Sequence, residues 1–284
     1  MQSLYPFLFV FLWSTGFIGA KFGLPYAEPL SFLLVRYLIV IALMTVIALA
    51  TRAPWPRERR QWLHIGVSGI LVHAVYLGGV FVAIGHGLPA GVTALVVGMQ
   101  PLLTALGAGG FLGERVSGRQ WSGLALGFVG VALVVSGSFR GGEALGSMLT
   151  PALVALFGIT AGTLYQKRFC ARFDLRTGSV IQFVPTAAVT ALAVAGFEDF
   201  RIEWTGSFAF ALAWLVLVLS LGAISLLNLL IRSGSAVNVA SLFYLTPPTT
   251  ALIAWAVFGE SLSLAATAGM ILAVGGVYLV GRPR

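Results

Sequence analysis

Large polar and aromatic side chains lie deep within apolar stretches of the sequence, where they could bind an organic molecule. His73 and Tyr76 are three residues apart and therefore share one face of a regular α-helix. Aromatic surfaces with a few hydrogen-bonding groups suit an amphipathic ligand. The residues that we predict to bind such a ligand are His73, Tyr76, Gln100, Tyr244, Trp13, Asn228, Asn238 and Tyr165.

Each of these side chains also has a structural interpretation. A polar group in hydrocarbon needs a partner, so an interhelical hydrogen bond explains any one of them equally well. His73 is the one deep group that titrates near neutral pH, and a structural histidine is the commoner case. Arg36 lies about two turns inside an apolar stretch. It could extend to the interface, cap a neighbouring helix or hold a substrate carboxylate.

Prolines interrupt two of the apolar stretches near their middle. A proline removes one backbone hydrogen bond and clashes with the carbonyl four residues earlier, which for Pro101 is the carbonyl of Val97. Pro247 and Pro248 do the same in the second stretch. In a bilayer such defects persist only where protein or a water-filled cavity compensates them. We predict paired kinks that line a cavity and take part in gating, with irregular packing as the alternative.

The chain repeats itself at a spacing of 146 residues, since Pro101 recurs as Pro247. The other matched pairs are Gly16 and Gly162, Lys21 and Lys167, Gly113-Glu114 and Gly259-Glu260, Gly123 and Gly269, and Gly130 and Gly276. Each copy holds five apolar stretches, and an odd number of crossings forces the second copy to enter the membrane upside down. Inverted repeats are typical of transporters whose central site faces either side in turn. The predicted repeats are 1–140 and 141–284.

The composition excludes a water-soluble globular protein. The chain is 58% hydrophobic and 9% charged, with a mean hydropathy of +0.97, whereas soluble domains carry about 25% charged residues. We predict an all-α integral membrane protein with ten transmembrane helices, built as two inverted five-helix repeats around a central cavity. The predicted helices are 4–22, 30–50, 63–85, 89–111, 118–137, 149–170, 178–196, 208–231, 236–258 and 263–281.

The basic residues predict how the chain is oriented. The net charge is +8, yet the charges are scattered over loops between apolar stretches, which favours the positive-inside rule over nucleic-acid binding. With a cytoplasmic N-terminus, 13 of the 17 Lys and Arg residues fall on the cytoplasmic side. We predict a multi-pass protein of the inner (cytoplasmic) membrane with both termini in the cytoplasm.

Small residues recur along one face of two predicted helices. They are Gly123, Gly127 and Gly130 in the first copy and Gly269, Ala273 and Gly276 in the second. Such faces let another helix approach closely, either within the same repeat or between the two. A monomer explains these faces, although a dimer interface is an alternative.

Charged residues recur at the ends of the predicted helices. Glu114 and Glu260 are predicted to cap helix starts. Lys21 and Lys167 are predicted to anchor helix ends at the membrane interface, with a gating salt bridge as the alternative.

A helix with a mid-span proline, a Gly-Glu pair at its end and a glycine-spaced helix after it resembles the EamA-type repeat of the drug/metabolite transporter superfamily. Both copies carry this motif, so the resemblance covers essentially the whole chain. Ten-helix members of this length look most like amino-acid and metabolite exporters, and the whole sequence looks closest to the YddG-type aromatic amino-acid exporters. The resemblance implies a basket of helices around a central cavity, with helices five and ten at the periphery.

The sequence lacks the residues that other mechanisms require. No Asp or Glu lies in the middle of a predicted helix, so a membrane-embedded carboxylate that binds cation and proton in turn is not available. This absence favours facilitated diffusion or exchange. The resemblance implies export of small amphipathic metabolites, chiefly aromatic or neutral amino acids. Lipophilic-cation efflux and an integral-membrane enzyme are the alternatives. The histidines are too far apart for the latter, and we expect no cofactor or metal.

Overall fold

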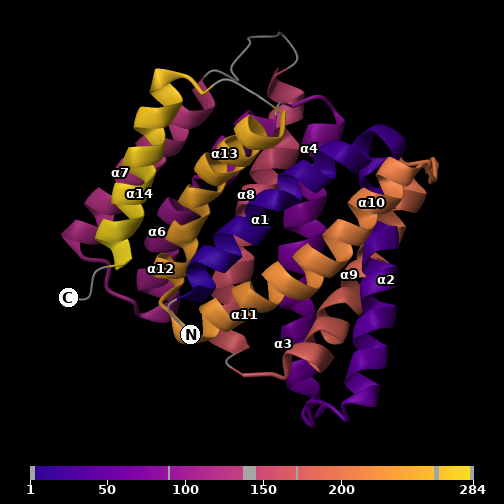
Figure 1. The fold of residues 1–284 in the computed structure, drawn as a ribbon. Coiled ribbons are helices and arrows are strands. Elements are labelled where there is room, and N and C mark those ends of the chain that lie inside the picture. Colours follow the sequence, from indigo (N-terminus) through magenta and orange to yellow (C-terminus); the bar gives the residue numbers. More distant parts are fainter. Residues whose placement is uncertain (1–3, 89, 137–144, 171, 259–261, 282–284) are drawn as a thin grey trace.

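The computed structural model describes residues 4–88, 90–136, 145–170, 172–258 and 262–281, which are almost wholly helical (Figure 1). Ten helical segments within these ranges are long and apolar enough to cross a membrane. They agree with the ten predicted helices to within a few residues. The predicted boundary between residues 140 and 141 lies outside the described ranges.

The first repeat begins with two uninterrupted helices, and its third and fourth spans are composite. Its elements are α1 (Tyr5–Gly23), the 3₁₀ turn η2 (Leu24–Tyr26), α2 (Pro29–Ala50), α3 (Arg59–Gly69) continuing through η3 (Ile70–Leu77) into α4 (Gly78–Gly85), α5 (Ala90–Val97), α6 (Gln100–Leu112) and α7 (Gly118–Val135). The second repeat has α8 (Leu145–Phe169), α9 (Leu175–Phe197), α10 (Gly206–Trp214) continuing through η5 (Leu215–Ala223) into α11 (Ile224–Ser233), α12 (Ala236–Ser241), η6 (Leu242–Leu245), α13 (Thr246–Phe258) and α14 (Leu264–Gly281).

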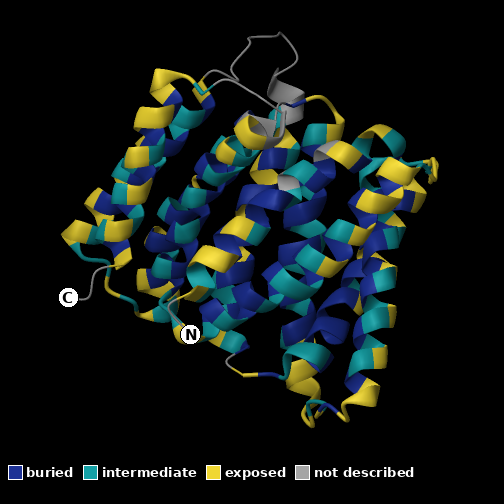
Figure 2. Cartoon of the chain, in the orientation of Figure 1, coloured by how far each residue is buried: buried dark blue, intermediate teal, exposed yellow. Residues whose placement is uncertain are grey.

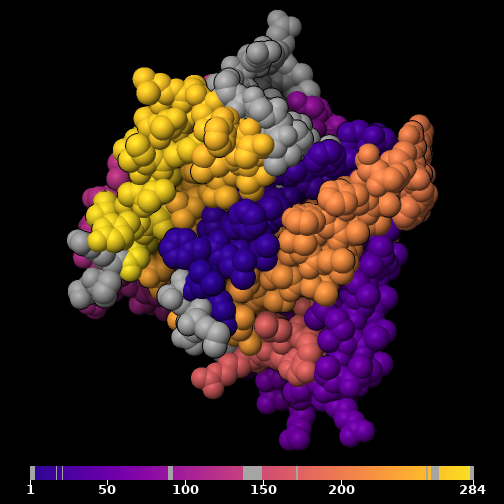
Figure 3. All heavy atoms as spheres, in the orientation of Figure 1, coloured from indigo at the N-terminus to yellow at the C-terminus, as the bar shows by residue number. Residues whose placement is uncertain are grey.

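The two repeats exchange their first helices. α1 packs against α10, η5 and α13 of the second repeat, and α8 packs against α3, η3, α4 and α6 of the first. Figure 3 shows α1 on the surface between α13 on one side and α10 with α11 on the other. Matched helices pair at the two edges of the molecule, α2 with α9 and α7 with α14 (Figure 1). Neither repeat therefore forms a complete packed unit without the first helix of the other.

The exposed and buried positions match a protein surrounded by lipid. Buried residues concentrate in the middle of the helix assembly (Figure 2). Large apolar side chains such as Phe7, Leu192, Phe197 and Ile271 are exposed on its outside. A soluble protein rarely exposes so much apolar area, whereas lipid tails solvate these side chains well.

Glycines hold α7 and α14 in direct contact. A Cβ placed on Gly130 would lie 2.5 Å from the backbone nitrogen of Ala273, and one on Gly276 would lie 2.5 Å from the carbonyl oxygen of Gly123. Of the two alternatives for the small-residue faces, the structure therefore shows helices five and ten packed against each other. Backbone-to-backbone contact of this kind is how helices associate where no hydrophobic driving force exists.

Charged side chains from both repeats hold the connection between α11 and α12. The carboxylate of Glu114 accepts from the backbone N–H of Ala236, with N–O distances of 3.1 and 3.2 Å, and so caps the start of α12 as predicted. Lys167 donates to the carbonyl of Ile231 at 2.9 Å and to that of Gly234. It caps the end of α11 and has no carboxylate partner in the described part of the chain. The side chain of Lys21 and residue Glu260 lie outside the described residues.

The α7–α14 contact can be tested with two alanine substitutions. Gly130→Ala forces the two backbones apart and should lower the free energy of unfolding by about 1–3 kcal/mol. Gly110→Ala in α6 is the matched control, because a Cβ there meets no atom within 4 Å. Thermal unfolding in detergent, followed by intrinsic fluorescence, should show a lower Tm for Gly130→Ala alone. Equal Tm values for both variants would contradict the contact.

Candidate functional site

Both helices that contain mid-span prolines are broken. α5 ends at Val97, two residues form a turn, and α6 begins at Gln100 with Pro101 in its first turn. Proline is tolerated there because the first helical N–H groups have no intrahelical acceptor. In the second repeat η6 separates α12 from α13, and Pro247 and Pro248 lie in the first turn of α13. A role of these prolines in gating stays a prediction.

The third span of each repeat contains a π-helical segment at an equivalent place. η3 covers Ile70–Leu77, and η5 covers Leu215–Ala223, which corresponds to 69–77 after subtraction of the 146-residue spacing. A π-helix bonds residue i to residue i+5, so each turn is wider and the side chains are redirected; such segments are frequent at functional sites. The hydroxyl of Tyr37 donates to the carbonyl of His73 within η3 at 2.9 Å.

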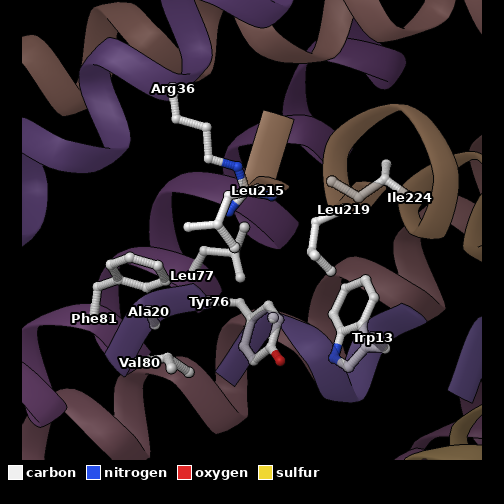
Figure 4. Close-up of a pocket in the computed structure, with 11 residues that line it drawn as sticks. Trp13, Ala20, Arg36, Tyr76, Leu77, Val80, Phe81, Leu215, Leu219 and Ile224 are labelled. Carbon is white, nitrogen blue, oxygen red and sulfur yellow. The ribbon is translucent and has the colours of Figure 1, made fainter. Parts of the chain in front are cut away.

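The two π-helical segments border a cavity (Figure 4). The cavity is narrow, with a volume of about 40 Å³. The rings of Trp13 and Tyr76 are stacked on one wall, with centroids 6.3 Å apart and planes 8° apart. Its lining residues are Trp13, Gly16, Ala20, Arg36, Tyr76, Leu77, Val80, Phe81, Leu215, Leu219 and Ile224. All are apolar or aromatic except Arg36, and none is acidic.

Arg36 is the lining residue whose role the sequence left open. Its side chain reaches from α2 toward the middle of the cavity, with the rings of Tyr76 and Trp13 on the opposite side (Figure 4). It is 2% exposed, and its Nε donates to the hydroxyl of Ser220 at 3.0 Å. The geometry excludes an interfacial position, since the guanidinium points into the protein.

Three of the predicted binding residues, His73, Gln100 and Tyr244, are buried but do not line this cavity. His73 stacks on Phe183 with ring centroids 4.4 Å apart, and neither of its ring nitrogens has a partner among the described residues. Gln100 donates to Thr163 at 3.4 Å, and its Oε1 has no donor in the described part. The hydroxyl of Tyr244, beside the second helix break, is buried and likewise unpartnered there.

The remaining predicted residues make hydrogen bonds between helices. Asn228 accepts from Gln166 at 2.7 Å and donates to Gln182 at 3.5 Å. Asn238 is half-buried and accepts from Gln120 at 3.3 Å. The hydroxyl of Tyr165 lies 2.6 Å from Nδ1 of His64. Of the eight predicted binding residues, the structure therefore brings Trp13 and Tyr76 together at the cavity and places the others elsewhere.

Helices approach one another closely in the symmetry-related region of the other half. There Gln182 stands in the position that corresponds to Arg36, at the 146-residue spacing, and it donates to Ser68 at 3.2 Å. A Cβ on Gly69 would lie 2.4 Å from the carbonyl oxygen of Gln182, and one on Gly162 would lie 2.6 Å from a methyl carbon of Val72. At these positions the helices are in direct contact.

Both halves of the chain match the model of the EamA-like transporter family, over residues 3–136 and 146–282. The chain belongs to the EamA-like transporter family. It is therefore related to transporters rather than to enzymes. A solved crystal structure shares the fold of this EamA-like protein with a TM-score of 0.79, covering 98% of this chain and 95% of the other at 23% identity.

Curated relatives of this EamA-like chain extend over nearly its whole length. The uncharacterized transporter YvbV of Bacillus subtilis is 31% identical over 95% of this chain and 88% of its own. The uncharacterized inner membrane transporter YedA of Escherichia coli is 27% identical over 90% and 83%. A probable amino-acid metabolite efflux pump of Salmonella typhimurium is 26% identical over 96% and 92%.

Two buried tyrosines provide a test of the hydrogen bonding around the cavity. Tyr37→Phe removes the donor to the His73 carbonyl and should lower the free energy of unfolding by about 0.5–1.5 kcal/mol. Tyr244→Phe is the matched control, because its hydroxyl has no acceptor to lose among the described residues. Thermal unfolding of the purified variants measures both effects. An equal loss of stability in Tyr244→Phe would show that its hydroxyl does have a structural partner.

Proposed function

We propose that this protein is a secondary transporter that exports small amphipathic metabolites, chiefly aromatic and neutral amino acids, by alternating access. The observation that carries the proposal is the cavity between the exchanged repeats, bordered by Arg36 of the first repeat and by the π-helical segments of both. A site between inverted repeats can face either side of the membrane in turn as the repeats move relative to each other.

The chemistry of the cavity supports an organic substrate with an apolar body. The parallel rings of Trp13 and Tyr76 offer a flat surface for an aromatic or aliphatic side chain, and leucines complete the walls. Mostly apolar pockets with few polar groups are typical small-molecule sites. The similarity to a protein named as an amino-acid metabolite efflux pump, and the resemblance to YddG-type exporters, support amino acids as the class.

The charges in the cavity favour facilitated diffusion or exchange. None of the described residues that line it is acidic, so they offer no carboxylate that could alternate between a proton and a cationic drug. The same observation disfavours the efflux of lipophilic cations. The proposed setting is the inner (cytoplasmic) membrane, with both termini in the cytoplasm.

Transport by proteoliposomes tests this function directly. Liposomes with the purified protein should accumulate labelled phenylalanine, tryptophan or leucine by exchange with unlabelled internal substrate, with or without a pH gradient. Trp13→Ala and Tyr76→Ala should lower the rate about tenfold or more, because each removes one face of the stacking surface. Trp255→Ala is the matched control, since Trp255 is 54% exposed on the outside of α13.

The other proposed binding residues enter the same assay as His73→Ala, Gln100→Ala and Tyr244→Ala. Reduced transport with an unchanged Tm would support their contact with substrate. If no compound of the panel moves, the proposed function is wrong. A strict requirement for the pH gradient would contradict facilitation and exchange, and would direct attention to His73.

Cysteine labelling tests the orientation. The single native Cys170 is buried, and burial raises the pKa of its thiol to about 11, so it reacts poorly with maleimides. In a Cys170→Ser background, Asp199→Cys should react with an impermeant maleimide added to intact cells. Glu58→Cys should react only after the membrane is opened. Both side chains are exposed, and the reverse pattern would place the termini outside.

A further inference from the structure

The guanidinium of Arg36 has more donors than partners. A guanidinium carries five N–H donors, and in this protein only Nε–H has an acceptor among the described residues, the Ser220 hydroxyl at 3.0 Å. Ser220 itself donates to the carbonyl of Leu215 at 3.2 Å, which fixes its hydroxyl as an acceptor for Arg36. The four N–H groups on the two terminal nitrogens are left to face the cavity (Figure 4).

No carboxylate neutralises this cation in the described structure. The ion pairs of Asp174 with Arg176 and of Asp199 with Arg201 lie at helix ends or in loops. Glu198, on the loop after α9, is occupied by the backbone N–H groups of Leu30 and Ser31 at 2.8 and 2.7 Å. Arg36 is therefore a buried positive charge without a counter-ion among the described residues.

A buried charge without a counter-ion is costly, and proteins retain one where it has a task. A guanidinium matches a carboxylate through two parallel N–H···O bonds, which are stronger than neutral hydrogen bonds. In this cavity the terminal nitrogens lie at one side and the stacked rings of Trp13 and Tyr76 at the other. A molecule that joins a carboxylate to an apolar body satisfies both sides at once.

We propose that Arg36 binds the carboxylate of the substrate, so that the transported class is carboxylic acids with an apolar or aromatic body. This rests on the proposed function, which it narrows. Ser220 is a positioning residue, because its hydroxyl holds Nε and turns the terminal nitrogens toward the cavity. The site is asymmetric, since the corresponding residue of the second repeat is the uncharged Gln182.

A series of four compounds isolates the carboxylate. Phenylalanine and 3-phenylpropionate carry it, whereas phenylalaninamide and phenethylamine keep the aromatic body without it. The purified protein in detergent should be stabilised against heat by the first two, with Kd values about tenfold or more below those of the other two. Equal or tighter binding of the amide and the amine would overturn the inference.

Variants assign the effect to Arg36. Arg36→Met should lose the preference for the two acids, and Arg36→Lys should keep it with about tenfold weaker binding, since an ammonium cannot make the bidentate pair. Ser220→Ala should weaken acid binding and raise KM for transport while kcat stays unchanged. Arg201→Met is the matched control, because that arginine is exposed and does not line the cavity. Acid binding by Arg36→Met at wild-type affinity would overturn the inference.

The unliganded variants show whether a loss of binding means a loss of fold. Replacing an uncompensated buried charge by an apolar side chain is often neutral or stabilising, so Arg36→Met should have a Tm equal to or above that of the wild type.

The binding assay also separates the two proposals. If liposomes transport none of the compounds but the acids bind through Arg36, the inference stands and the proposed function fails. If amino acids are transported equally by wild type and Arg36→Met, the proposed function stands and the inference fails.

Discussion

The exchange of first helices between the repeats is the contact on which the remaining structure depends. α1 lies on the second repeat and α8 on the first, so the space between the halves is enclosed by helices of both. Lipid provides no hydrophobic force to drive these helices together, and close backbone approach replaces it. Gly158, for example, has backbone atoms of the π-helical segment η3 within 3.1 Å of its ideal Cβ position. The cavity follows from this interleaving, since α1 supplies the wall formed by Trp13, Gly16 and Ala20.

The two repeats share their backbone features, whereas the side chains at equivalent positions differ between them. The helix breaks, the π-helical segments and the α7–α14 glycines recur at the same spacing in both repeats, and they determine where the backbone can change shape. The side chains at equivalent places differ: Arg36 corresponds to Gln182, His73 to Leu219 and Gln100 to Thr246. A site enclosed between two such halves therefore has different side chains on its two sides, even though the backbone elements around it recur in both repeats.

Hydropathy and proline positions were sufficient to predict ten helices and two interruptions, because both depend on local composition. The lining of the cavity was harder to predict, since depth in a span does not determine the direction of a side chain. His73 and Tyr76 share a face in a regular α-helix, but the wider turn of η3 separates them. Tyr76 faces the cavity, and His73 packs on Phe183. Nothing in the sequence marks η3 as π-helical, and Arg36 could have been placed only once its neighbours were known.

The missing counter-ion of Arg36 also affects the empty protein. Enclosing a bare guanidinium in a medium of low dielectric costs more than enclosing it together with a carboxylate. Where Arg36 holds a substrate anion, the loaded protein therefore passes through its occluded state faster than the empty one does. The return of the unloaded protein would then be the slow step of the cycle. Substrate that binds from the other side of the membrane would accelerate this return. A cation that has no carboxylate partner among the described residues would thus couple movement in one direction to movement in the other, with no second ion required.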